Sequence, residues 1–131
     1  MPERDQRNTR QRAAIRNAFE RAGRPLSLPQ VLDAAQADVE GLGIATVYRN
    51  IKALTEDGWL AAIELPGAAT VYERAGKVHH HHFHCDRCSR VFELTGCIPT
   101  INRLAGRRFS VTRHELVLYG ICSECKAAVR A

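Results

Sequence analysis

Two pairs of cysteines, each with a two-residue gap, are the residues of this chain best suited to chemistry. The first pair is Cys85 and Cys88, and the second is Cys122 and Cys125. Both sulfurs of such a pair can approach one ion at about 2.3 Å, so the four thiolates together predict a closed, tetrahedral zinc site. Two disulfides or a redox-active pair are the alternatives. Zinc is favoured because the polar N-terminus, which lacks the apolar segment of a signal peptide, indicates a cytoplasmic protein, and disulfides are rare there.

A run of histidines leads directly into the first cysteine pair. Alternate residues of a strand point the same way, so His80 and His82 should share one face and His79 and His81 the other. Each pair can then contribute to a separate metal site. Imidazole binds zinc, iron, nickel and copper, so the histidines alone do not choose the metal. A polar, solvated strand is the alternative, and His84 is expected to be exposed or to orient a ligand.

The elements that would position these ligands follow from hydrophobic patterning. Residues 90–94 and 109–119 are predicted to be strands, and residues 98–105 a helix whose apolar side chains face inward. A domain of about 55 residues cannot form a large core, which is a further reason to expect a structural metal. The fifth cysteine, Cys97, is expected to be a small buried hydrophobic residue, with a metal ligand or a redox thiol as the alternative.

The first half of the chain shows three helical segments followed by a hairpin. Thr9 precedes the first helix, and Ser27 and Thr46 are the expected N-cap residues of the second and third. A proline and a glutamine in the first turn of the second helix strengthen that prediction. A Pro-Gly turn separates the two strands of the hairpin. Three helices and a hairpin predict a winged helix, with helices at 10–22, from Ser27 and at 47–57, and strands at 59–63 and 69–73.

The chain is basic, with a net charge of +5 over 131 residues, and much of this charge lies at the N-terminus. Residues 1–24 contain seven arginines and three acidic residues, so their net charge is +7 − 3 = +4. A basic segment beside a helix-turn-helix suits contact with phosphates, and a solubilising tail is the alternative. An apolar content of 45% argues against disorder. No apolar run approaches the roughly 20 residues that a membrane-spanning helix needs.

The third predicted helix carries polar residues suited to contact with DNA. Tyr48, Arg49 and Lys52 lie near its start and project from its polar face. An arginine can form two hydrogen bonds with a guanine edge or a phosphate, and a tyrosine can pack against thymine methyls or sugars. A capped surface helix with ordinary charges is the alternative.

Eight short segments, which together span almost the whole chain, carry a resemblance to a known family. They are 9–12, 45–49, 71–73, 79–82, Cys85 with Cys88, 91–93, 114–116, and 118–122 with Cys125. In this order they resemble the ferric uptake regulator family of bacterial metal-dependent repressors, most of all its zinc uptake regulator branch. Each segment alone is weak evidence for the family, but the combination of all eight is highly specific.

The resemblance implies an α+β protein with a winged helix-turn-helix at 1–73, a linker at 74–78 and a small α/β dimerisation domain at 79–131. It implies a cytoplasmic homodimer that is not an enzyme and has no membrane partner. Loaded with metal, it would bind operator DNA and repress metal uptake genes. A basic residue before the first helix contacts DNA in the family, and Arg7 matches it. The other residues implied to contact DNA are Thr46, Tyr48, Arg49 and Lys52.

The resemblance also implies two metal sites besides the structural zinc site. The regulatory site would use Glu73, His80, His82 and Glu93. The additional site would use His79 and His81, with His114 as a possible further ligand.

Departures from the family pattern bear on the identity of the metal. Pro25 and Ala61 stand where some relatives have ligands. His81 replaces an aspartate that is common in iron-type members, and the loss of an oxygen ligand favours zinc. A cysteine common in zinc sensors near the end of the wing is absent, which favours iron. The implied cofactors are a structural Zn²⁺ and a regulatory Zn²⁺, with Fe²⁺ or Mn²⁺ as alternatives to the second.

Two rival functions follow from the same residues. An iron- or peroxide-responsive repressor of the same family would differ only in its regulatory metal. A zinc-dependent hydrolase would use a histidine site with an open coordination position, but the chain has no His-Glu-x-x-His motif. Glu73 and Glu93 resemble ligands rather than a placed general base.

Overall fold

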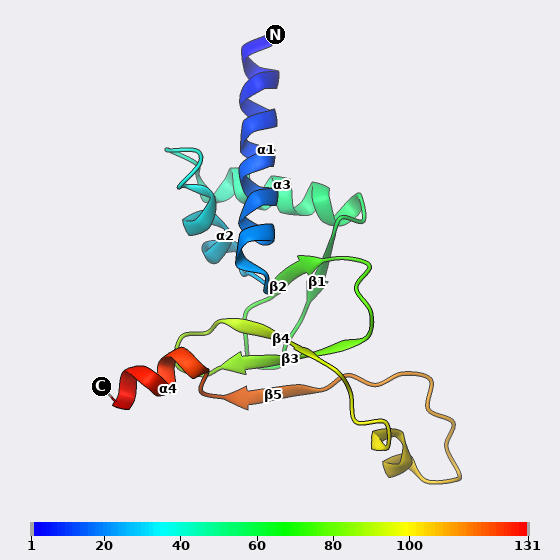
Figure 1. Ribbon diagram of the computed structural model, residues 1–131. Helices are drawn as coiled ribbons and strands as arrows, with labels where there is room; N and C mark the ends of the chain where they lie inside the picture. Colours follow the sequence, from blue (N-terminus) through cyan, green and yellow to red (C-terminus); the bar gives the residue numbers. More distant parts are fainter. Residues whose placement is uncertain (1, 131) are drawn as a thin grey trace. The chain divides into compact units, whose positions relative to one another are not determined.

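The computed structural model describes residues 2–130, and it divides between Gly76 and Lys77 into two compact units. In chain order the first unit contains α1 (Pro2–Ala22), α2 (Leu28–Ala35), α3 (Ile44–Glu56), β1 (Leu60–Ile63) and β2 (Val71–Arg74) (Figure 1). The two strands form an antiparallel hairpin in which Ala61 lies opposite Glu73. Three helices followed by a hairpin confirm the predicted winged helix.

Two of the predicted helix starts are wrong. α1 begins at Pro2 rather than Arg10, so Thr9 lies within the helix, where its hydroxyl donates a hydrogen bond to the Asp5 carbonyl, 2.8 Å away. Residues 3–12 are polar, so they show no hydrophobic periodicity, although arginine, glutamine and glutamate are good helix formers. α3 begins at Ile44 with Gly43 as its N-cap. The predicted cap of α2 is correct: the Ser27 N–H donates to Gln30 Oε1 at 3.0 Å.

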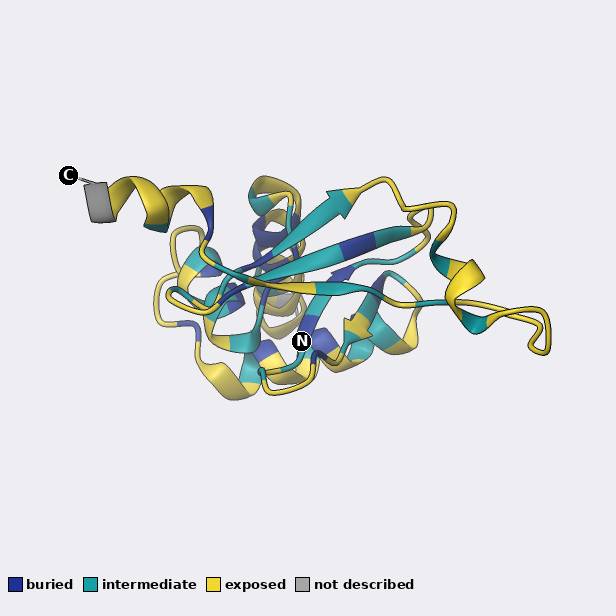
Figure 2. Ribbon diagram, turned by 90° about the horizontal axis from the view of Figure 1, so that it is seen from below, coloured by how far each residue is buried: buried dark blue, intermediate teal, exposed yellow. Residues whose placement is uncertain are grey.

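The core of the first unit lies where the three helices and the hairpin meet. Figure 2 shows its buried segments in dark blue. The ring of Phe19 packs edge-on against Trp59, with 6.2 Å between the ring centroids. The guanidinium of Arg74 lies over the ring of Trp59, 4.0 Å from its centroid. The completely or almost completely buried apolar residues include Ile15, Leu26, Val31, Val47, Ile51, Leu54 and Val71.

Truncation of one of these residues should destabilise the first unit measurably. Leu54 is 1% exposed, so Leu54→Ala leaves a cavity and is expected to lower the free energy of unfolding by about 2–5 kcal/mol. Chemical denaturation followed by the fluorescence of Trp59, the only tryptophan, would measure it. Ile44→Ala in the same helix is the matched control, since Ile44 is 47% exposed, and should change the value by only about 0.5 kcal/mol. Equal effects of the two substitutions would contradict this account of the core.

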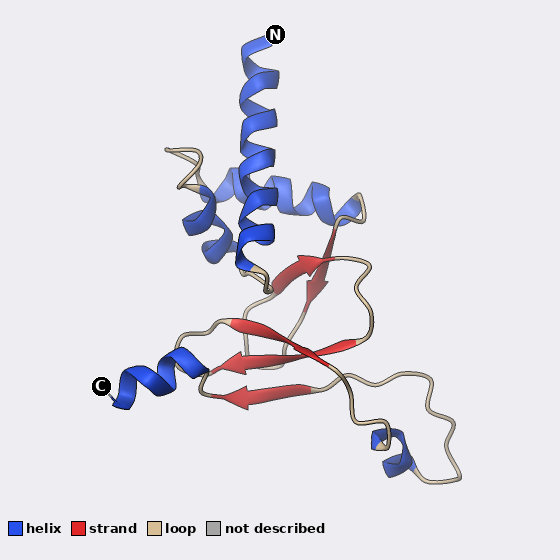
Figure 3. Cartoon of the chain, viewed as in Figure 1, coloured by secondary structure: helices blue, strands red, loops and turns tan. Residues whose placement is uncertain are grey.

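The second unit is a three-stranded sheet with a small terminal helix. Its strands are β3 (His80–Cys85), β4 (Val91–Thr95) and β5 (Val117–Gly120), in the order β4-β3-β5. β3 is antiparallel to β4 and parallel to β5. A 3₁₀ helix, η1 (Ile101–Ala105), lies in the connection between β4 and β5, and α4 (Ser123–Arg130) follows β5 (Figure 3). The combination of both units confirms the predicted α+β class.

The connection between β4 and β5 differs from the prediction. Of the predicted strand at 109–119, only residues 117–119 form a strand, as part of β5, and the predicted helix is reduced to η1. The apolar side chains of the segment predicted to be a helix, 98–105, do not face a core: Ile98 is 56% exposed and Leu104 is 88% exposed. The hydrophobic pattern was therefore a poor guide here, because it marks a surface rather than the interior. None of the helices described is both long and apolar enough to cross a membrane.

Candidate metal centres and nucleic-acid interface

The four paired cysteines come together in the second unit with the spacing of a metal site. Cys85 ends β3, its partner Cys88 lies in the following turn, Cys122 directly precedes α4, and Cys125 lies in the first turn of that helix. The Sγ atoms of Cys85 and Cys125 are 3.8 Å apart, as are those of Cys88 and Cys122. A disulfide needs about 2.05 Å. Four sulfurs at about 2.3 Å from one zinc ion are separated by roughly 3.8 Å, so the residues fit a tetrahedral zinc site.

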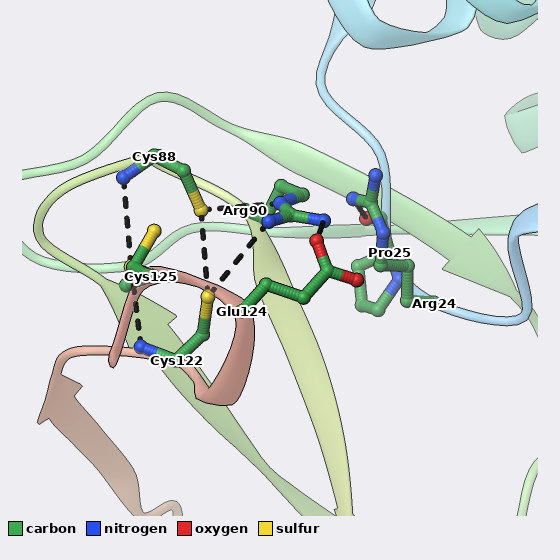
Figure 4. A network of polar contacts seen from close by, with 8 residues as sticks. Arg24, Pro25, Cys88, Arg90, Cys122, Glu124 and Cys125 are labelled. Atoms are coloured by element: carbon green, nitrogen blue, oxygen red, sulfur yellow. Dashed lines mark hydrogen bonds and ion pairs between the residues drawn. The ribbon is translucent and has the colours of Figure 1, made fainter. Parts of the chain in front are cut away.

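Hydrogen-bond donors contact the sulfurs of Cys85 and Cys88 and favour their thiolate form. The backbone N–H of Cys88 and that of Cys122 donate to Cys85 Sγ at 3.5 and 3.4 Å. Arg90 Nε donates to Cys88 Sγ at 3.1 Å, and Glu124 holds this guanidinium at 2.7 Å (Figure 4). The Cys88 N–H lowers the pKa of Cys85 to about 6, whereas burial raises the pKa of Cys125 to about 12. Zinc binding therefore requires the release of at least one proton.

One face of β3 carries the histidines predicted for the regulatory site. The rings of His80 and His82 lie on the same side, with 4.8 Å between their centroids. Glu93 on β4 is paired directly opposite His82, and its Oε1 lies 3.9 Å from His80 Nδ1. His80 Nδ1 also lies 2.8 Å from the Val78 carbonyl, so Nε2 is the nitrogen that would bind an ion. The structure thus brings three of the four predicted residues together within the second unit.

Two further residues bear on this regulatory set. Glu93 Oε2 accepts a hydrogen bond from Lys77 Nζ at 2.8 Å, so an ion bound to this carboxylate would compete with an ammonium group. The fourth predicted ligand, Glu73, belongs to β2 of the first unit and is 7% exposed. A carboxylate is rarely so deeply buried without a compensating charge or hydrogen bond.

The opposite face of β3 carries a second cluster, which contains one residue that the sequence prediction placed elsewhere. His114 Nε2 lies 3.1 Å from His79 Nε2, 3.3 Å from His81 Nε2 and 3.0 Å from Cys97 Sγ. Cys97 Sγ is also 3.2 Å from His81 Nε2. The predicted set of three histidines is therefore assembled, with a thiol as its fourth member. Cys97 is exposed, so the prediction of a buried hydrophobic residue is wrong, and its alternative as a ligand fits the geometry.

Burial and neighbouring charge keep the central histidine of this second cluster neutral. His81 is 4% exposed. Its burial, followed by the positive charge that His79 and His114 would carry if protonated, lowers the pKa of His81. A neutral ring retains the lone pair that a metal ligand requires. His84 takes no part in either cluster; its Nδ1 lies 3.3 Å from Asp86 Oδ1 and its ring contacts Tyr119.

The residues predicted to contact DNA lie on the exposed side of α3 and on α1. Tyr48 is 52% exposed, and Arg49 and Lys52 are also exposed. Thr46 lies in the first turn, where its hydroxyl accepts a hydrogen bond from Arg49 Nη2 at 3.2 Å. Arg7 is exposed but lies inside α1 rather than before it, because the helix begins earlier than predicted. The residues predicted to contact DNA therefore lie on two helices, α1 and α3.

These features define a winged-helix protein whose second unit holds ligand clusters for metal ions, and comparison with known proteins names its family. The sequence profile of the ferric uptake regulator family matches residues 3–119. The chain belongs to the ferric uptake regulator family. Its membership confirms the resemblance found in the sequence motifs.

Individual relatives are named for different metals. A ferric uptake regulation protein from Campylobacter upsaliensis is 36% identical over 106 residues, covering 77% of this chain and 66% of the relative. The chain thus spans just under two thirds of that protein. A zinc uptake regulation protein from Mycobacterium tuberculosis is 29% identical over 126 residues, covering 92% of this chain and 95% of the relative. Among solved structures, a zinc-bound manganese uptake regulator superposes with a TM-score of 0.73 at 25% identity, covering 86% of this chain and 87% of that one.

Proposed function

We propose that this protein is a metal-dependent transcriptional repressor that binds operator DNA as a homodimer, responds to zinc and controls metal uptake genes in the cytoplasm. The observation that carries the proposal is the combination, in one chain of this family, of an exposed basic recognition helix with separate ligand clusters for metal ions. A repressor of this kind is not an enzyme, in agreement with the regulatory name of the family.

The surface of the winged helix supports DNA binding. A recognition helix enters the major groove with its N-terminal residues toward the bases, and Tyr48 and Arg49 lie in the first half of α3. Arg12 on α1 reaches Asn50 on α3, with 3.5 Å between Nε and Oδ1, so the two helices present their polar residues together. The arginines of α1 would add contacts with phosphates that do not depend on sequence.

Exposed apolar side chains on the second unit support a homodimer. Both β4 and β5 are edge strands, and an exposed edge can pair with another chain. Apolar residues concentrated on one small unit mark a surface for association. These residues are Ile98, Leu104, Phe109, Val111, Leu118, Tyr119 and Ile121.

The regulatory ligands would be Glu73, His80, His82 and Glu93. A set of two imidazoles and two carboxylates fits zinc, and it also fits iron or manganese. Zinc is proposed because His81 stands in the second cluster where iron-type relatives commonly have an aspartate, so that nitrogen replaces an oxygen ligand. An ion held by all four residues would fix the orientation of the wing, and it can favour DNA binding only if the DNA-competent geometry binds it more tightly. The second set, His79, His81 and His114, would hold a further ion.

A selection experiment tests the proposed function and the choice of metal together. The protein, stripped of weakly held metal but retaining zinc on its four cysteines, would be incubated with a random duplex library and zinc, ferrous iron or manganese. Zinc is expected to enrich a single palindromic sequence at the lowest free metal concentration. Enrichment with ferrous iron alone would overturn the zinc assignment, and no enrichment with any metal would overturn the repressor function.

Substitution on α3 tests how DNA is read. Arg49→Ala is expected to weaken binding to the selected duplex by about 1–3 kcal/mol and to relax the preference at one base pair, because it removes a base contact. Lys52→Ala should weaken binding to selected and unrelated duplexes alike and reduce the salt dependence by about one charge. Fluorescence anisotropy at several salt concentrations distinguishes the two effects.

Lys126→Ala is the control for these two variants. It removes the same charge from an exposed position on α4 of the second unit, and it should leave both affinities unchanged. A uniform loss of affinity in all three variants would show that only total charge matters and would contradict the assignment of α3.

A further inference from the structure

In the cluster formed by His79, His81, Cys97 and His114, more polar atoms surround one nitrogen lone pair than can form hydrogen bonds with it. His114 Nδ1 lies 2.9 Å from Asn102 Oδ1, which can only accept, so Nδ1 carries the proton and Nε2 carries the lone pair. Three atoms, from the other members of the cluster, lie 3.0–3.3 Å from this single lone pair. One lone pair can accept one good hydrogen bond, so a cation accounts for the arrangement better than hydrogen bonding does.

The distances also fit a tetrahedral ion. With zinc–nitrogen bonds of about 2.0–2.1 Å, the nitrogens of such a site lie roughly 3.3 Å apart. The corresponding distances from His114 Nε2 to His79 and His81 are 3.1 and 3.3 Å. Sulfur–nitrogen distances in the same geometry are roughly 3.6 Å. The observed values for Cys97 are 3.0 and 3.2 Å, so its Sγ would move outward by a few tenths of an ångström on metal binding.

We propose that Cys97 binds metal as a thiolate in this second site and makes it selective for zinc. Three neutral imidazoles and one thiolate suit a tetrahedral zinc ion, and cobalt(II) as its spectroscopic substitute. The set contains no oxygen ligand of the kind that manganese prefers. The inference rests on the occupancy proposed above for the second set of histidines, and it adds the fourth ligand and the selectivity.

The position of Cys97 means that metal binding would also restrain the connection between β4 and β5. Cys97 follows β4 and His114 precedes β5, and with 3.0 Å between Sγ and Nε2 they join the two ends of the connection that carries η1. Figure 3 shows the course of this connection. His81 lies at the start of β3, and His79 directly precedes this strand. An ion bound to all four would attach both ends of the connection to the sheet, and the exposed arginines within it, 103, 107, 108 and 113, would become poorer sites for trypsin.

Cobalt titration tests the thiolate directly. Protein that keeps zinc on its four paired cysteines would receive cobalt(II) without any DNA, and the near-ultraviolet absorption would be followed, because a cobalt–thiolate bond gives an intense charge-transfer band. The regulatory set contains no sulfur and should not contribute. The expected result is a band that saturates with one equivalent, is removed by excess zinc and survives excess manganese. Zinc content after the titration verifies that the four-cysteine site was not exchanged.

Variants make each outcome of the cobalt titration decisive. Cys97→Ser should abolish the band and still bind cobalt, whereas His84→Ala, which alters a histidine of the same strand outside the cluster, should leave the band unchanged. Binding of cobalt without any band would overturn the thiolate ligand but not the histidine site. Binding of no more than one equivalent of cobalt, without the band, would overturn both. Neither result bears on DNA binding, which the duplex selection tests separately.

Two readouts independent of cobalt complete the test. N-ethylmaleimide should modify Cys97 rapidly in the metal-free second site and slowly with zinc bound, as mass spectrometry of peptides would show. Asn102→Ala removes the acceptor that orients His114 and should weaken zinc binding at this site by about 10–100-fold, whereas Asn102→Asp should restore it. Equal alkylation with and without zinc would contradict the assignment.

Discussion

Replacing Cys85 by serine is expected to unfold the second unit while leaving the winged helix intact. Cys85 is completely buried, and its sulfur accepts two backbone N–H groups besides lying in the four-sulfur cluster. The apparent free energy of zinc binding by four such ligands is on the order of 10–16 kcal/mol, which exceeds what a unit of this size gains from its own core. Few apolar side chains of the second unit are buried besides Val91 and the cysteines themselves, among the residues described.

The two units can be followed separately in this experiment. Trp59 lies in the first unit, so its emission should remain native in Cys85→Ser, while circular dichroism loses the signal of the second unit and sedimentation shows monomers. Tightly bound zinc should fall by one equivalent per chain. Cys97→Ser is the matched control, because its thiol lies outside the four-sulfur cluster, and it should keep that zinc and the fold. A stable dimer with Cys85→Ser would refute the structural role.

The cluster of four cysteines could be predicted because its members are local in sequence. A Cys-x-x-Cys pair brings two sulfurs to one ion whatever the surrounding fold, so only the meeting of the two pairs depends on tertiary structure. The two faces of the histidine strand were predictable for a similar reason. Side chains alternate along any strand, and the ring of His80 lies beside that of His82, and the ring of His79 beside that of His81, as expected.

The role of Cys97 could not be predicted from local pattern. It is separated from His114 by an irregular connection, and neither periodicity nor spacing says that the two ends of this connection meet. The only signal was a fifth cysteine without a pair. The apolar residues of the connection misled for a related reason: hydrophobic periodicity identifies a face to be covered, but it does not say whether the covering comes from the same chain.

His82→Ala is expected to abolish the metal dependence of DNA binding without affecting the fold. His82 lies opposite Glu93 in the sheet and beside His80, so its removal deletes a ligand from the centre of the regulatory set. Coupling between an effector and a second ligand is typically worth a factor of about 5–150 in affinity, and this factor should disappear. Anisotropy of the selected duplex, measured with and without zinc, gives the factor directly, and sedimentation verifies that the protein remains a dimer.

The matched control for this variant is His84→Ala, two residues further along the same strand. His84 contacts Asp86 and Tyr119 instead of the regulatory set, so its loss should preserve the full response to zinc. The comparison separates a ligand from a histidine that merely occupies the strand, since both variants remove one imidazole from the same face. If His82→Ala kept the zinc response, the proposed regulatory set would be wrong, even if the protein still repressed transcription by binding metal elsewhere.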